Sequence, residues 1–192
     1  MNKFPEALEK ARKIYEENEE IREWAKTASI VEAEGYCEWP RLKDTVEFAK
    51  KMNFKKIGIA CCIGLINEAK KVADIITNYG FEANVVMCKT GGLKKSELGL
   101  SDDFIMTSKT GYLIGTVSCN PTAQATILNE VQTDMNIIVG LCVGHDMVFT
   151  KLSEAPVTTL IAKDRRLNHN PASILYTHYG RSYVQKDLSQ SK

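Results

Sequence analysis

Four cysteines, Cys62, Cys88, Cys119 and Cys142, are the residues of this sequence best suited to chemistry. They lie far apart along the chain, and each stands at the end of a predicted strand or just before a predicted helix. Cysteine thiolates bind zinc and the irons of iron-sulfur clusters. Any one of them could instead be a small buried hydrophobe, and redox or sulfur-relay thiols are a third interpretation. The set as a whole predicts a shared metal centre.

The spacing expected between the four sulfurs indicates which metal they bind. Four sulfurs around one zinc ion, each about 2.3 Å from it, must lie within about 4.6 Å of one another. That is tight for residues from three strands and a helix start, whereas an iron-sulfur cluster accepts wider spacing. We therefore expect a [4Fe-4S]-type cluster, with a zinc-thiolate module as the alternative. No closely spaced Cys-x-x-Cys pair supports either metal, so the prediction depends on the fold.

Two further cysteines are weaker candidates. Neighbouring residues of a strand point to opposite faces, so only one of Cys61 and Cys62 can easily join the set. Cys37 stands alone in the segment EGYCEWP, which is predicted to be a loop, and we do not expect it to be a ligand.

Polar residues accompany the cysteines at the same predicted edge. His145 and Asp146 follow Cys142, and the segment KDRRLNHNP follows the last predicted strand. If three thiolates bind an iron and leave it open, His145 or Lys163 could handle protons and Arg165 could orient an anion. The plainer interpretation is that Asp146 caps a helix and the segment is a solvated loop. An enzyme and a non-catalytic electron carrier or binding module both remain open.

The elements that must position these residues form an alternating pattern. Short apolar runs with the character of buried strands alternate with helical patterns, which predicts a parallel sheet covered on both faces. The fold class is therefore α/β, a three-layer Rossmann-like (flavodoxin-like) sheet of order 2-1-3-4 with an N-terminal helical extension. Ligands of such sheets bind at the carboxyl ends of the strands. Strands are expected at 56–62, 82–88, 136–144 and 155–164, and helices at 67–78, 121–131 and 145–152.

Two stretches depart from this alternation. Residues 1–53 are predicted to be a helical segment that packs on the α/β domain of residues 54–192, with one amphipathic helix near the N-terminus and a second after Pro40. Residues 89–118 are far longer than an ordinary strand-helix connection. They predict a lid, a binding loop or a small subdomain.

Composition excludes several classes of partner. The chain of 192 residues carries 25 basic and 24 acidic residues, for a net charge of +1, so neither nucleic acid nor a membrane is expected to bind it. The charged N-terminus lacks a secretory signal, which together with six cysteines favours reduced thiols in the cytoplasm. Nucleotide-binding motifs and GxSxG are absent. A small-molecule or sulfur-containing substrate fits, and homo-oligomerisation stays open.

Several segments together resemble a known family. The motifs GIACCIGL, VMCKTGG, SCNPTAQATILN, GLCVGHDMVF and APVTTLIAKDRRLNHNP are similar to those of uncharacterised predicted metal-binding proteins, with a domain of unknown function, from anaerobic bacteria and archaea. The resemblance covers roughly residues 35–176 and implies metal binding without an established reaction. It aligns the first-strand ligand with Cys62. Many relatives carry an extra cysteine-rich N-terminal segment, where this chain has a charged helix. The other matching positions are Cys88, Cys119, Cys142, His145, Asp146, Lys163, Asp164, Arg165, His169 and Asn170.

Overall fold

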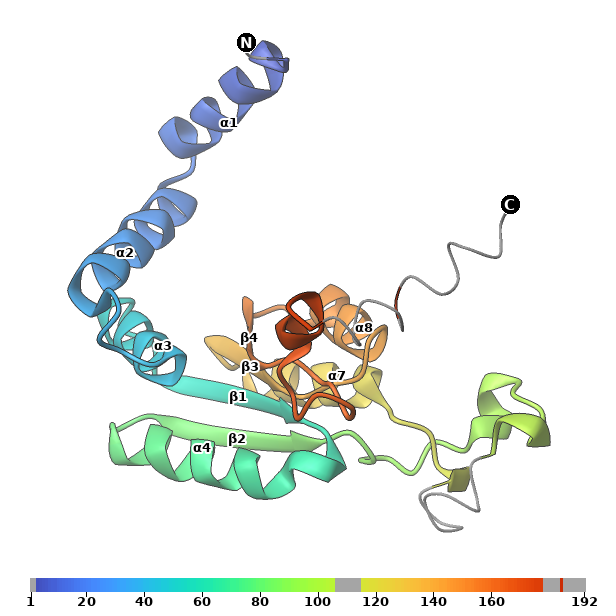
Figure 1. Cartoon of the computed structure of the whole chain (residues 1–192). Coiled ribbons are helices and arrows are strands. Elements are labelled where there is room, and N and C mark those ends of the chain that lie inside the picture. The colour runs from blue at the N-terminus through green and yellow to red at the C-terminus, as the bar shows by residue number, and fades with distance from the viewer. Residues whose placement is uncertain (1–2, 106–114, 178–183, 185–192) are drawn as a thin grey trace. The chain divides into compact units, whose positions relative to one another are not determined.

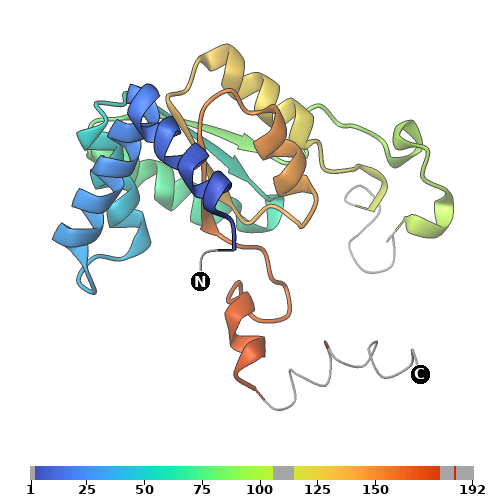
Figure 2. The ribbon, with the colours of Figure 1, turned by 90° about the horizontal axis from the view of Figure 1, so that it is seen from above.

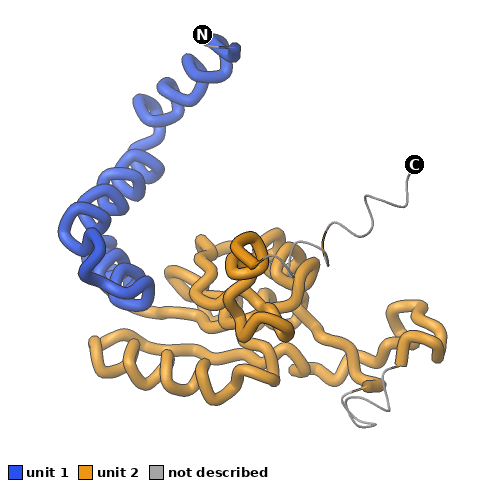
Figure 3. Tube along the Cα trace, viewed as in Figure 1, with its two compact units in different colours: residues 1–54 blue, residues 55–192 orange. Residues whose placement is uncertain are grey.

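The computed structural model describes residues 3–105, 115–177 and 184. The chain divides into two compact units, residues 1–54 and residues 55–192 (Figure 3). The packing of the helical segment on the α/β unit stays a prediction.

The first unit is helical, with three helices where two were expected. They are α1 (Pro5–Glu17), α2 (Glu19–Gly35) and α3 (Arg41–Lys51). The additional break lies at Asn18, whose extended backbone ends α1 and whose side chain accepts a 3.1 Å hydrogen bond from the backbone N–H of Ile21. Asparagine is a favoured N-cap because its side chain satisfies a backbone donor of the first helical turn.

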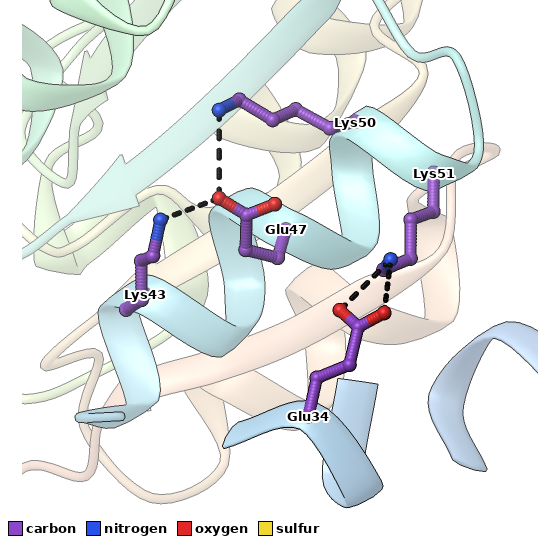
Figure 4. A network of polar contacts seen from close by, with 5 residues as sticks. All are labelled: Glu34, Lys43, Glu47, Lys50 and Lys51. Carbon is purple, nitrogen blue, oxygen red and sulfur yellow. Dashed lines mark hydrogen bonds and ion pairs between the residues drawn. The ribbon is translucent and has the colours of Figure 1, made fainter. Parts of the chain in front are cut away.

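Helices α2 and α3 pack through small and β-branched residues. Val31 of α2 and Val46 and Ala49 of α3 are buried. Around them, Lys51 pairs with Glu34 across the two helices at 2.9 Å, and Glu47 accepts from two lysines of its own helix, Lys43 and Lys50 (Figure 4). Helix α1 has no buried residue, so its apolar side chains contribute little to the core of this unit.

The second unit is built on a four-stranded parallel sheet. Its strands are β1 (Lys56–Cys61), β2 (Glu82–Met87), β3 (Met135–Val139) and β4 (Val157–Ile161), in the order β2-β1-β3-β4. The predicted α/β fold class and strand order are confirmed. Strand β3 ends earlier than expected because Gly140 adopts a left-handed conformation, φ +70°, which turns the chain out of the sheet.

Helices cover both faces of this sheet and complete three layers. Helix α4 (Ile66–Asn78) packs on β1 and β2 from one side, and α7 (Pro121–Val131) and α8 (His145–Leu152) lie on the other (Figures 1 and 2). Beneath α7 and α8, a buried apolar cluster continues from the sheet to its carboxyl edge. Its members include Ala60, Val86, Ile138, Ala125, Leu128, Phe149, Cys62 and Cys88.

The remaining elements are short. Four 3₁₀ helices are described: η1 (Ile63–Leu65), η2 (Lys95–Leu98), η3 (Asp102–Phe104) and η4 (Pro171–Leu175). The long excursion contains η2 and η3 and returns through an antiparallel bridge between Lys94 and Val117; its residues 106–114 lie outside the described residues. Within the described ranges, no helix combines the length and apolarity needed to cross a membrane.

Candidate metal centre

The four cysteines meet at the carboxyl edge of the sheet, each delivered by a different segment. Cys62 follows β1, Cys88 follows β2, Cys119 precedes the α7 N-cap, and Cys142 lies between β3 and α8. Backbone hydrogen bonds hold these segments together. The N–H of Cys62 donates to the carbonyl of Val139 at 3.1 Å, and the carbonyl of Cys88 accepts from the residue after Cys119 at 2.7 Å. These bonds hold Cys62 beside the end of β3 and the segment of Cys119 beside Cys88.

The four thiol groups are neighbours in the order Cys62, Cys88, Cys119, Cys142 and form a ring, in which each influences the pKa of the next and Cys62 also influences that of Cys142. Cys62 and Cys88 are buried, whereas Cys119 and Cys142 are half-buried. The ring therefore lies at the boundary between the apolar core and the solvent. Cys119 and Cys142 form its open side, which is the side nearer the solvent.

The other two cysteines lie elsewhere. Cys61 is fully buried, and as the residue before Cys62 at the end of β1 it faces the opposite side of the sheet. Burial raises the pKa of the Cys61 thiol to about 11, so it stays protonated. Cys37 is exposed and belongs to the helical unit.

Three nitrogen donors point at sulfurs of the ring. Lys163 Nζ donates to Cys62 Sγ at 3.3 Å, Arg165 Nη2 donates to Cys142 Sγ at 3.0 Å, and the backbone N–H of Ile63 donates to the sulfur of Cys88 at 3.3 Å. Lys163 and Arg165 both come from the loop after β4. Contacts of this kind stabilise negative charge on sulfur.

His145 lies against the open side of the ring. Its imidazole interacts with Cys119 and Cys142, and these contacts raise the pKa of His145 to about 10 although burial opposes the charged form. Its Nδ1 atom is buried, and among the described residues it has no hydrogen-bond partner. A buried polar atom without a partner is costly, which makes this nitrogen a place where a bound group would be stabilised.

The pKa values of three thiols in the ring shift in different directions. Contacts with Cys142 and Cys88, together with His145 and the charge of Lys89, hold the pKa of Cys119 far below its usual range. The contact with Cys119 has the opposite effect on Cys88, whose pKa rises because this thiol acts as a donor to its neighbours. For Cys142, the contact with Cys119 raises the pKa, but Cys62 and His145 outweigh it and the net shift is downward. The ring thus carries thiolate character before any ligand arrives.

The remaining predicted polar residues shape the loops and do not contact the thiols. Asp146 does not cap α8, because the N-cap is Gly144; its carboxylate accepts from the N–H of Met147. Asp164 accepts from the backbone N–H groups of the two residues after Arg165, and His169 Nδ1 accepts from the N–H of Asp164 at 3.1 Å. These bonds close the turn that presents Arg165. Asn170 is the N-cap of η4.

Gln124 is a site residue that the sequence did not reveal. It is fully buried in α7, and its Nε2 donates to the carbonyls of Cys61 at 3.1 Å and Val86 at 2.7 Å. It thereby ties together the ends of β1 and β2, where Cys62 and Cys88 begin. A lone polar residue in an otherwise apolar helical face was the only available signal.

The donor set fits a thiophilic metal centre in its chemistry. Four thiols, three N–H donors on sulfur and an unpartnered imidazole nitrogen surround one point of the sheet edge. Among the residues that the structure describes, however, no group of three or more His, Cys, Asp or Glu side chains is arranged to hold a metal ion. The side chains would therefore have to adjust around a bound group.

Comparison with known proteins decides the family. The family model described as protein of unknown function (DUF1847) matches residues 1–160. The chain belongs to this family. The match to DUF1847 includes the helical unit, whereas the resemblance seen in the sequence motifs covered roughly residues 35–176. The chain is also 47% identical over 179 residues to the uncharacterized protein MJ0455 of Methanocaldococcus jannaschii, covering 92% of this chain and 87% of that protein.

Proposed function

We propose that this DUF1847 protein binds a metal centre through Cys62, Cys88, Cys119 and Cys142, and that the centre is an iron-sulfur cluster of the [4Fe-4S] type. The observation that carries the proposal is that four separate segments bring these cysteines to one edge of the sheet, where nitrogen donors lie 3.0–3.3 Å from the sulfurs of three of them. Buried cysteines that act only as small hydrophobes have no reason to converge with two cations and an imidazole around them.

The origin of the thiols in four separate segments favours a cluster over a single zinc ion. Zinc requires its four sulfurs within about 4.6 Å of one another, which is a tight spacing for residues that follow three strands and precede a helix. A cluster spreads its ligands over several irons and is held by cysteine thiolates. We therefore keep zinc as the alternative that the metal analysis must exclude.

The chain's own residues have separable roles in this proposal. A bound cluster supplies one-electron transfer, and an iron with an exchangeable ligand also supplies Lewis acidity. The cysteines bind, and Ile63 holds the sulfur of Cys88 through its N–H. If the protein is an enzyme, its small-molecule or sulfur-containing substrate would meet His145, the polar side chain at the open side of the ring. Reduced thiols suit the cytoplasm, which is the compartment we propose.

Anaerobic purification followed by iron, sulfide and zinc analysis tests the proposal. We expect brown protein with iron and acid-labile sulfide in equal amounts and a broad visible absorption that dithionite bleaches. Cys119→Ser should lose most of this iron, because it removes a ligand at the half-buried side of the ring. Cys37→Ser and Cys61→Ala are matched controls that remove cysteines lying outside the ring, and they should retain it.

The alternatives give different results. Colourless protein with one equivalent of zinc would replace the cluster with a zinc-thiolate module. Protein that binds neither metal after anaerobic reconstitution would overturn the metal centre itself. Equal iron loss in Cys61→Ala and Cys119→Ser would overturn the assignment of the ligands.

A further inference from the structure

Two cations from one loop reach two different sulfurs of the ring. Strand β4 is followed by Lys163 and Arg165, which donate to Cys62 at 3.3 Å and to Cys142 at 3.0 Å. Both residues belong to the loop that follows the end of β4 at Ile161. A single loop therefore supplies both charges to the same edge.

Two glycines line the path of the Lys163 side chain. A Cβ atom added to Gly140 would lie 3.6 Å from Lys163 Cδ, and one added to Gly64 would lie 3.4 Å from Lys163 Nζ and 3.9 Å from Cys62 Sγ. The lysine side chain thus passes close to both glycines, at van der Waals distance from where a Cβ would stand, before its Nζ reaches the sulfur of Cys62.

Each sulfur of the ring has a nitrogen neighbour of its own. Lys163 serves Cys62, the N–H of Ile63 serves Cys88, Arg165 serves Cys142, and the imidazole of His145 lies against Cys119. A doubly charged cation held by four thiolates keeps two excess negative charges, which must be balanced in a partly buried site. Hydrogen bonds to ligand sulfurs provide this balance and tune the reduction potential.

We infer that Lys163 and Arg165 are positioning residues whose hydrogen bonds to the sulfurs of Cys62 and Cys142 orient these side chains, so that all four cysteines bind the metal at once. This inference rests on the proposed metal centre and deepens it. It gives both cations a role through sulfur, in place of the direct substrate contact that the sequence suggested for them. It also favours a centre closed by four protein ligands over one with an open iron.

Cobalt binding to the metal-free protein tests the inference without any assay of activity. Co²⁺ is titrated anaerobically against a competing chelator, and the thiolate-to-cobalt absorption is recorded. Loss of a residue that supports a ligand typically lowers metal affinity 10- to 100-fold, and we expect this for Lys163→Gln and for Arg165→Gln. Lys151→Gln removes the same charge from an exposed position in the last turn of α8 and should change affinity less than twofold.

Conservative variants separate positioning from general stability. Lys163→Arg and Arg165→Lys keep the charge and a donor, so each should recover a large part of the lost affinity, and circular dichroism should show all variants folded. In reconstituted iron protein, the midpoint potential should fall in Lys163→Gln, because the reduced cluster loses a compensating charge. If the substitution weakens stabilisation of the reduced cluster tenfold relative to the oxidised cluster, the midpoint potential should fall by about 59 mV, the value for one electron.

The outcomes distinguish the two proposals. If the wild type binds Co²⁺ and iron but Lys163→Gln and Arg165→Gln behave like Lys151→Gln, the positioning role is wrong and the metal centre stands. A cobalt spectrum whose intensity is unchanged when Cys62 or Cys142 is replaced by serine would also overturn the four-ligand inference. If the wild type binds neither metal, the metal centre fails and this inference fails with it.

Discussion

Gly140→Ala is the substitution that should damage this fold and its thiol ring together. Gly140 ends β3 with φ +70°, a conformation that costs a residue with a side chain roughly 1–2 kcal/mol. An added Cβ would lie 2.0 Å from Cδ1 of Leu65, with Cγ of the same side chain at 3.4 Å. Leu65 is only 4% exposed, so it cannot swing into solvent, and relieving such overpacking typically costs about 1–3 kcal/mol. The free energy of unfolding should therefore fall by about 2–5 kcal/mol.

A displacement of Leu65 would also affect the four cysteines. The N–H of Leu65 donates to the carbonyl of Cys62 at 2.9 Å, so a shift of Leu65 moves the turn that presents this sulfur. Gly140→Ala should thus weaken cobalt binding as well as stability. A total stability of 5–15 kcal/mol is usual for a domain, so the variant should still fold and both quantities can be measured.

Urea unfolding followed by circular dichroism measures the first effect, with Gly80→Ala as the matched control. Gly80 also has a positive φ, +91°, but an added Cβ would meet nothing within 4 Å. The control should therefore lose only the conformational cost of roughly 1–2 kcal/mol. If Gly140→Ala loses no more than Gly80→Ala, then Leu65 yields freely and the reasoning from packing is wrong.

Three further predictions test other parts of the structure. Gly58→Ala should lower the free energy of unfolding by more than 2 kcal/mol in urea titrations, because the new Cβ would lie 1.9 Å from the buried Asn136 Oδ1; a smaller loss would show that Asn136 can move. Glu47→Gln should reduce the loss of stability on acidification, because the hydrogen bond from Lys43 lowers the Glu47 pKa below 4.5. The ionised Glu47 therefore contributes at most about 1 kcal/mol to stability, which is present above pH 4.5 and lost as the pH falls. Urea midpoints of both proteins at pH 7 and pH 3 measure this difference. Gln124→Ala should weaken cobalt binding and cost about 2 kcal/mol or more, since two buried hydrogen bonds to strand carbonyls are lost; unchanged cobalt affinity would exclude a role for Gln124 in the site.

The starts of β1 and β2 were predicted exactly because apolar runs mark them directly, whereas β4 is shorter at both ends than expected. The helix over residues 121–131 was found at its exact bounds, since Asn120 and Pro121 are a favoured cap and first-turn residue. The break at Asn18 was missed because the apolar pattern continues on both sides of it. The end of β3 was missed because apolar residues continue to Val143, and only the positive φ of Gly140 shows where the sheet stops.

The convergence of thiols was predictable from topology, but the orientation of the cations was not. Parallel strands in the order β2-β1-β3 place the residues after each strand at one edge, and this is a property of the pattern. Which of Lys163, Arg165 and Arg166 faces the ring depends on the loop after β4, where Asn168 and His169 adopt positive φ values of 50° and 63°. Residues other than glycine rarely adopt such angles, and although Asn and His do so more often than most, these residue types alone do not fix the path of the loop.

The order of the sheet also explains why the Lys163 side chain passes close to Gly140. Strand β4 neighbours β3, not β1, so a side chain from the loop after β4 must cross the end of β3 to reach the sulfur that follows β1, about two strand spacings of 4.8 Å away. Gly140 turns the chain there and adds no side chain of its own, and Lys163 Cδ lies 3.6 Å from where a Cβ would stand. Arg165 has no such crossing to make, because Cys142 follows the neighbouring strand. Gly140→Ala should displace Leu65, whose N–H donates to the carbonyl of Cys62. It should therefore impair the contact of Lys163 with Cys62 while leaving that of Arg165 with Cys142 in place, and combining it with Lys163→Gln should weaken cobalt binding by less than the product of the two separate effects.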